Sequence, residues 1–88
     1  MRRGKIDIKA EILEVCKEPQ IITQILIKVG RFGGYYAQYV RELTQKGLLK
    51  AEGEKRLGKK YQTTEKGLQW LKTYKQLKEI EEHGFPIT

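Results

Sequence analysis

The chain has 88 residues and a formal net charge of +7 at pH 7, with 18 Lys and Arg against 11 Asp and Glu. This length accommodates one domain with a single modest core. The single cysteine excludes an internal disulfide or a cysteine-based zinc site, and no stretch approaches the roughly 18 apolar residues of a membrane span. The segment MRRGKIDIKAEI lacks the apolar core of a signal peptide, so we expect a cytoplasmic protein.

The positive charge is concentrated in the first two thirds of the chain. Residues 1–60 contain 14 Lys and Arg against 7 Asp and Glu, whereas residues 61–88 contain 4 of each. A basic field attracts polyanions, but it does not separate DNA from RNA or from an anionic membrane. Charge alone therefore does not decide between two interpretations: a domain that binds an anionic partner and a basic domain that is simply solvated.

Three amphipathic helices are predicted in the first half of the chain. Apolar residues at helical spacing indicate a helix over 4–17, which Pro19 ends because proline disfavours helical geometry in the residue before it. The stretch IITQILIKV indicates a short second helix over 21–29, which Gly30 can end. A third helix is predicted over 34–46. Its apolar stripe, expected to face the core, consists of Tyr36, Tyr39, Val40 and Leu43.

A β-hairpin and a last helix are predicted to follow. Gly47 suits the end of the third helix, and the next residues, LLKAE, indicate a strand over 48–52. A second strand is predicted over 60–63, after a glycine-bounded loop with too few apolar residues to pack. Thr63 or Thr64 can cap a helix that extends to about residue 82.

Two helices across a glycine turn, followed by a basic hairpin, are the layout of a winged helix-turn-helix. We therefore expect an α+β fold in the order helix, helix, helix, strand, wing, strand, helix. Residues 1–64 are the predicted DNA-binding unit, and residues 65–88 are a predicted dimerisation helix and tail within the same structural domain.

The exposed face of the third helix is the first candidate site. Arginine can pair with guanine, glutamine with adenine, and tyrosine can contact a thymine methyl group or a phosphate. Glu42 is expected at the edge of this face, because a carboxylate is unfavourable near phosphate. The alternative is an ordinary solvated helix face. The candidate residues, with those of the preceding turn, are Arg31, Gly34, Tyr35, Gln38, Arg41 and Gln45.

The wing is the second candidate site. Four cations fall within six residues, namely Lys55, Arg56, Lys59 and Lys60. They suit phosphates, or an arginine entering a minor groove, and we favour this interpretation. The alternative is that lysines on an exposed hairpin edge prevent aggregation.

An amino-terminal basic arm is the third candidate site. It consists of Arg2, Arg3 and Lys5, and could contact the DNA backbone or minor groove. A disordered basic terminus explains these residues equally well. Gly33 and Gly34 could let backbone N–H groups approach a phosphate, but the need of a tight turn for small residues explains them better.

The last helix carries a predicted dimer interface. Leu68 and Leu71 suit packing onto the domain, whereas other positions follow the 4, 3, 4 spacing of a coiled-coil seam. A symmetric dimer would bury the apolar residues that a small core cannot reach, and would present two reader helices to a palindromic site. The predicted interface residues are Trp70, Tyr74, Leu77, Ile80 and Glu81.

Three segments carry a resemblance to a known family: ILEVCK in the first helix, LTQKGLL at the end of the third, and YQTTEKGLQWL entering the last. With them the chain resembles the small archaeal winged-helix DNA-binding proteins of the transcription-regulator type. The resemblance implies a winged-helix fold and a dimeric coiled coil formed by the last helix. Gly33 and Gly34 depart from it, because this family usually has polar or larger residues there.

Nothing in the sequence indicates an enzyme, a metal site or a cofactor. Glu11, Glu14 and Glu18 are best explained as a solvated helix face, because no histidine accompanies them. His83, four residues after Glu79, is better explained by its place near a helix end than by metal binding. We likewise expect neither a small-molecule substrate nor membrane association.

The predicted function is that of a dimeric double-stranded DNA-binding protein, with transcriptional regulation as the first choice. An architectural, chromatin-type role is close behind. A winged helix used for protein–protein interaction and an RNA-binding winged helix are further alternatives. The expected location is the nucleoid, or the host cytoplasm if the protein is viral.

Overall fold

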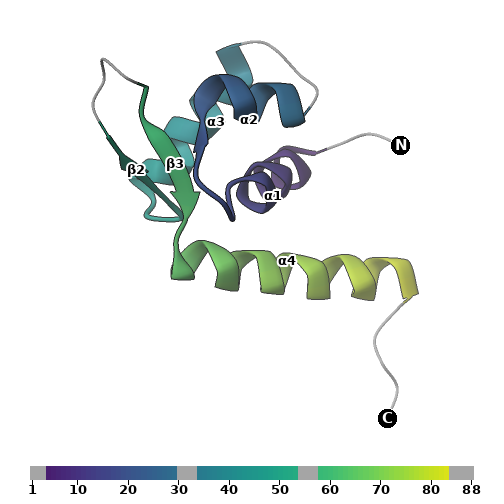
Figure 1. Ribbon diagram of the computed structural model, residues 1–88. Coiled ribbons are helices and arrows are strands. Elements are labelled where there is room, and N and C mark those ends of the chain that lie inside the picture. The colour runs from purple at the N-terminus through teal and green to yellow at the C-terminus, as the bar shows by residue number, and fades with distance from the viewer. Residues whose placement is uncertain (1–3, 30–33, 54–57, 84–88) are drawn as a thin grey trace.

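The computed structural model describes residues 4–29, 34–53 and 58–83. Its elements follow one another as α1 (Lys5–Val15), β1 (Gln20–Ile21), α2 (Ile22–Lys28), α3 (Gly34–Gln45), β2 (Leu49–Glu52), β3 (Lys60–Thr63) and α4 (Glu65–His83), as Figure 1 shows. The predicted α+β winged-helix order is therefore confirmed. The predicted helices and strands begin and end within two residues of the observed ones.

The sheet contains one strand that the sequence did not predict. Its order is β1-β3-β2, with β3 antiparallel to both neighbours. Residue 21 was expected to begin the second helix, but Gln20 and Ile21 pair with Tyr61 and Lys60 instead. A strand of two residues has no periodicity to detect, and its partners are about forty residues away in the chain. The extended backbone at Ile21, with φ −79° and ψ 159°, then serves as the start of α2.

The core lies among the first three helices, the sheet and the first turns of α4. Ile12 and Leu13 of α1, and Cys16 directly after it, are fully buried, as the helical spacing predicts. Burial raises the pKa of the Cys16 thiol to about 12, so this cysteine is an inert core residue. The other buried apolar residues are Ala10, Ile25, Val29, Val40, Leu43, Leu48, Leu49 and Leu71.

The segments LTQKGLL and YQTTEKG meet at one junction between α3, β2 and α4. Gly47 ends α3 with a φ of +80°, which glycine adopts without strain. The Thr64 hydroxyl donates a hydrogen bond to the Gly47 carbonyl oxygen at 2.6 Å and accepts one from the Gly67 amide at 3.1 Å, so it caps α4. The Thr64 amide also donates to the Leu48 carbonyl oxygen at 3.0 Å.

Gly67 is required at this junction for steric reasons. A Cβ atom built on it would lie 2.3 Å from the Leu48 carbonyl oxygen and 2.6 Å from the Thr63 Cγ2 atom. Thr63 itself is buried, and its hydroxyl donates to the Leu13 carbonyl oxygen at 2.6 Å. The start of α4 is therefore packed against Leu48, just after α3, and against Thr63 of β3, which is hydrogen-bonded to α1.

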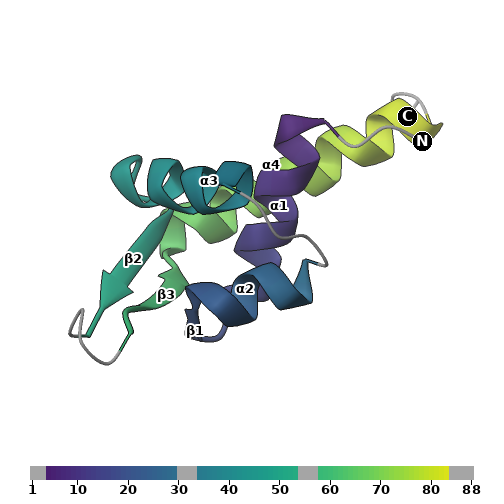
Figure 2. The ribbon, with the colours of Figure 1, turned by 90° about the horizontal axis from the view of Figure 1, so that it is seen from above.

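Helix α4 lies along α1 and extends beyond the rest of the domain. Figures 1 and 2 both show the hairpin at one end of the molecule and the last turns of α4 at the other. In the described part of the chain, no helix is long and apolar enough to cross a membrane.

Candidate nucleic-acid interface

The outer face of α3 presents three polar side chains in a row. Gln38, Arg41 and Gln45 are exposed, whereas Val40 and Leu43 on the opposite side are buried in the core. We call these three exposed residues the reader row. Their arrangement follows from the helical repeat, which places residues three and four apart on the same face. Each of the three side chains is free to approach another molecule.

Some of the predicted residues of this site cannot be placed fully. Gly34 and Tyr35 lie in the first turn of α3, but the structure describes only their backbone. Arg31, in the turn before α3, lies outside the described residues. Their roles at DNA therefore stay predictions.

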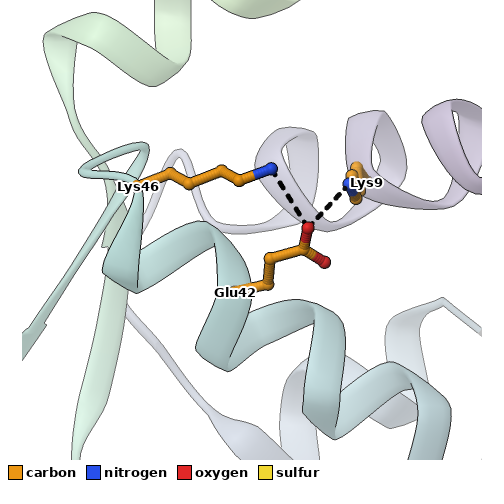
Figure 3. Close-up of polar contacts among 3 residues, drawn as sticks. All are labelled: Lys9, Glu42 and Lys46. Carbon is orange, nitrogen blue, oxygen red and sulfur yellow. Dashed lines mark hydrogen bonds and ion pairs between the residues drawn. The ribbon is translucent and has the colours of Figure 1, made fainter.

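Glu42 lies beside the reader row and is held by two lysines, as Figure 3 shows. Its Oε1 atom accepts hydrogen bonds from Lys9 Nζ at 3.3 Å and from Lys46 Nζ at 3.1 Å. The Lys46 and Lys9 ammonium groups hold the pKa of the Glu42 carboxyl below its usual value. We call Lys9, Glu42 and Lys46 the Glu42 clamp.

The clamp connects α3 to α1. Lys9 belongs to α1, and its ammonium group lies 5.9 Å from the centre of the Tyr39 ring of α3, as well as beside Glu42. The Lys9 side chain is only 18% exposed, whereas that of Lys46 is 60% exposed. No sequence pattern indicated this contact, although Glu42 was expected at the edge of the exposed face.

The wing is described at its base. Gly53 and Gly58 have φ values of +104° and +85°, which glycine tolerates at the two ends of the hairpin tip. Lys59 and Lys60 are exposed on the second strand side. The other two predicted wing cations, Lys55 and Arg56, lie outside the described residues.

Lys50 is an exposed cation of the wing that was not predicted from the sequence. It follows the buried Leu49 in β2, where the three residues after Leu49 are all exposed. Its ammonium group lies 3.4 Å from Glu52 Oε1. An exposed pair of this kind contributes little to the stability of the fold.

Only the last residue of the predicted basic arm can be placed. Lys5 is exposed and begins α1, whereas Arg2 and Arg3 lie outside the described residues. The start of α1 is fixed by Asp7, whose Oδ2 atom accepts a hydrogen bond from the Gly4 amide at 3.0 Å.

The predicted dimer interface on α4 divides into two parts. Trp70 and Tyr74 are half-buried and pack on the core, with parallel rings whose centres are 5.7 Å apart. Further along the helix, Leu77 is 46% exposed and Glu81 is exposed, while Ile80 is half-buried. The prediction that Leu68 packs onto the domain is wrong. Leu68 is 44% exposed, because only Leu71 of these two faces the core.

An open apolar groove of about 410 Å³ runs along this part of α4. Its wall on the α1 side includes Ile6, which is 52% exposed. The residues that line it are Ile6, Leu48, Lys66, Gln69, Trp70, Thr73, Tyr74 and Leu77. Exposed apolar side chains gathered in one groove are typical of an interaction surface.

No metal-binding arrangement accompanies these surfaces in the ranges that the structure describes. Cys, His, Asp and Glu residues there form no group of three that could bind a metal ion.

Comparison with known proteins gives two findings. The family model of the winged helix-turn-helix matches residues 2–82. Among solved structures, the crystal structure of Sso10a-2, a DNA-binding protein from Sulfolobus solfataricus, superposes with a TM-score of 0.82 at 28% sequence identity. The match covers 91% of this chain and 83% of that one. Comparison with curated proteins gives no match. The resemblance to small archaeal winged-helix proteins is thereby confirmed.

Proposed function

Because this chain belongs to the winged helix-turn-helix family, we propose that it binds double-stranded DNA as a homodimer and regulates transcription. The observation that carries the proposal is the exposed reader row of α3, which leads directly into a basic wing. The fold is shared with Sso10a-2, a DNA-binding protein of Sulfolobus solfataricus. The family match supports a binding protein over an enzyme. Its place of action is then the nucleoid.

The chemistry of the reader row suits the edges of bases. With α3 in a major groove, the Arg41 guanidinium can donate two hydrogen bonds to guanine, and Gln38 or Gln45 can pair with adenine. Tyr35, Arg31 and Gly34 are proposed to contribute further DNA contacts, as the sequence predicts.

Cations at both sides of the reader row would position the protein on the duplex. The wing residues Lys59 and Lys60, with Lys55 and Arg56, would contact phosphates or enter a minor groove. The arm formed by Arg2, Arg3 and Lys5 would contact a second stretch of backbone. These contacts add affinity but carry no sequence information.

A second copy of the chain is the proposed occupant of the apolar groove. Helix α4 has 19 residues, about 28 Å, and carries Leu77 and Ile80 past the end of the core. Burying them together with Ile6 requires another apolar surface, and a second α4 supplies a matching one. Trp70, Tyr74, Leu77, Ile80 and Glu81 would form the interface. The dimer would then carry two reader rows, as a palindromic site requires.

An architectural DNA-binding role is the second candidate. The net charge of +7 on 88 residues favours it, because sequence-independent binding rests on phosphate neutralisation. A regulator and an architectural protein differ in whether base identity matters. This difference can be measured directly.

Two experiments test the proposal. Selection of bound sequences from a random duplex pool, followed by footprinting, should yield a protected palindrome. Uniform coverage would identify an architectural protein instead. A mobility shift on random duplex at low salt tests DNA binding itself. A chain that gives no shift there would contradict DNA binding and favour a protein-interaction module, and preference for structured RNA would favour an RNA-binding one.

A further inference from the structure

Glu42, the acidic member of the Glu42 clamp, places a negative charge where DNA-binding surfaces usually carry positive charge. Glu42 follows Gln38 by four residues and precedes Gln45 by three, so it lies on the flank of the reader row. When a helix lies in a major groove, its flanks approach the phosphate backbones. A carboxylate at this flank repels phosphate, and it also occupies the two cations nearest to it.

The geometry of the clamp shows which lysine Glu42 keeps from contacting other anions. One oxygen atom, Oε1, accepts hydrogen bonds from both Lys9 and Lys46. Lys46 is the more accessible partner, with 60% of its side chain exposed against 18% for Lys9. Lys9 has a further reason to stay in place, because it also lies over the Tyr39 ring. Lys46 is therefore the cation that loss of the carboxylate would release.

We propose that Glu42 limits sequence-independent binding of duplex DNA by holding Lys46, and to a lesser extent Lys9, away from phosphate oxygens. This inference rests on the proposed DNA-binding function. It identifies Glu42 as a specificity-determining residue, because phosphate contacts raise the affinity for every sequence alike. Weaker contact with the backbone leaves a larger share of the binding energy to the reader row.

The energetics allow this role without a large cost in stability. Glu42 is 36% exposed, and ion pairs between accessible groups contribute little to folding. Glu42→Gln keeps the size of the side chain and removes its charge. We expect this variant to fold, with a melting temperature within a few degrees of that of the wild type.

The test compares binding of a random-sequence duplex by the wild type and by Glu42→Gln across salt concentrations. Release of one lysine to one phosphate makes the slope of log K against log salt steeper by about 1, and raises affinity about tenfold at 50 mM salt. The ratio of affinities for a selected site and for random duplex should fall in the variant.

Glu14→Gln is the matched control. Glu14 also holds two lysines, with Oε1 at 2.9 Å from Lys17 Nζ and Oε2 at 3.4 Å from Lys75 Nζ, but it joins α1 to α4. Glu14→Gln changes the net charge by the same amount as Glu42→Gln, so it measures the effect of net charge alone on DNA binding. A second variant, Glu42→Gln with Lys46→Gln, should return the slope toward that of the wild type.

The outcomes separate this inference from the proposed function. If Glu42→Gln and Glu14→Gln bind random duplex alike, or if Lys46→Gln fails to reverse the gain, the inference is overturned while DNA binding stands. If the wild type binds no duplex at low salt, the proposed function is overturned, and this inference with it. A gain specific to Glu42→Gln that Lys46→Gln cancels supports the inference.

Discussion

The phenol of Tyr74, in α4, donates a hydrogen bond to Asp7 Oδ1, in the first turn of α1, across 67 residues of the chain. Lys78 Nζ lies 3.2 Å from the same oxygen atom. Asp7 also caps the start of α1 through the Gly4 amide. The Asp7 carboxylate therefore connects the beginning of α1 to the middle of α4.

Tyr74→Phe should lower the free energy of unfolding by about 1 kcal/mol, because it removes one hydrogen bond to a charged acceptor. Urea unfolding measures the change. A double-mutant cycle with Asp7→Ala should give a coupling energy of about 1 kcal/mol. Strictly additive effects would show that the two side chains do not interact in solution.

Stability should fall as the pH is lowered below about 4. The Tyr74 hydroxyl, with the Gly4 amide and Lys78, lowers the pKa of Asp7 from its ordinary value of 3.8. A pKa that is lower in the folded state gives stability that is present above the unfolded value and is lost as the pH falls through the folded one. Urea unfolding at pH 6 and pH 3 should show a smaller loss for Asp7→Asn than for the wild type. An equal loss would exclude Asp7 as a contributor.

Gly67→Ala should destabilise the fold by about 3 kcal/mol, because the added methyl group collides with backbone at Leu48. Thermal unfolding measures the loss. Gly4→Ala is the control, since a Cβ there meets only the Asp7 carboxylate, at 3.5 Å. We expect the control to cost less than about 1 kcal/mol. Equal losses would contradict the steric argument.

We expect two different effects on DNA binding from Arg41→Ala and from a double variant with Lys59→Gln and Lys60→Gln. Loss of Arg41 should cost about 1–3 kcal/mol on a selected site and relax the preference at one base position. Loss of the two lysines should weaken binding to every duplex and reduce the salt slope by about 2. Titration of selected and random duplexes measures both effects. An unchanged salt slope would exclude these lysines from phosphate contact.

Leu77→Glu should convert a dimer to a monomer, because it places a charge in the apolar groove. Leu68→Glu is the matched control, since Leu68 is equally accessible on α4 but does not line the groove. Sedimentation of the two variants at matched concentrations gives the comparison. A wild type that sediments as a monomer would contradict the dimer itself.

Local patterns predicted most of this fold, and long-range contacts account for what they missed. Helical spacing identified the reader row, and Gly47 and Thr64 act as the predicted caps. Strand β1 was missed because its hydrogen-bond partners come from a distant part of the chain.

Contacts between side chains of different helices also could not be predicted from sequence patterns. Lys9 and Glu42 lie 33 positions apart, so no spacing rule connects them. Leu68 and Leu71 are both leucines on one helix, and only the three-dimensional path of α4 past α1 decides which of them is buried.

The junction at Thr64 links the start of α4 to the end of α3, since Thr64 hydrogen-bonds to Gly47 and Leu48, both within three residues of the last residue of α3. If α4 pairs two copies of the chain, the junction at Thr64, and not a flexible linker, would set how far apart the two α3 helices lie along a duplex and how they are rotated about its axis. The dimer would then fit only one spacing between half-sites. Adding a few base pairs between them would weaken binding as much as changing a contacted base.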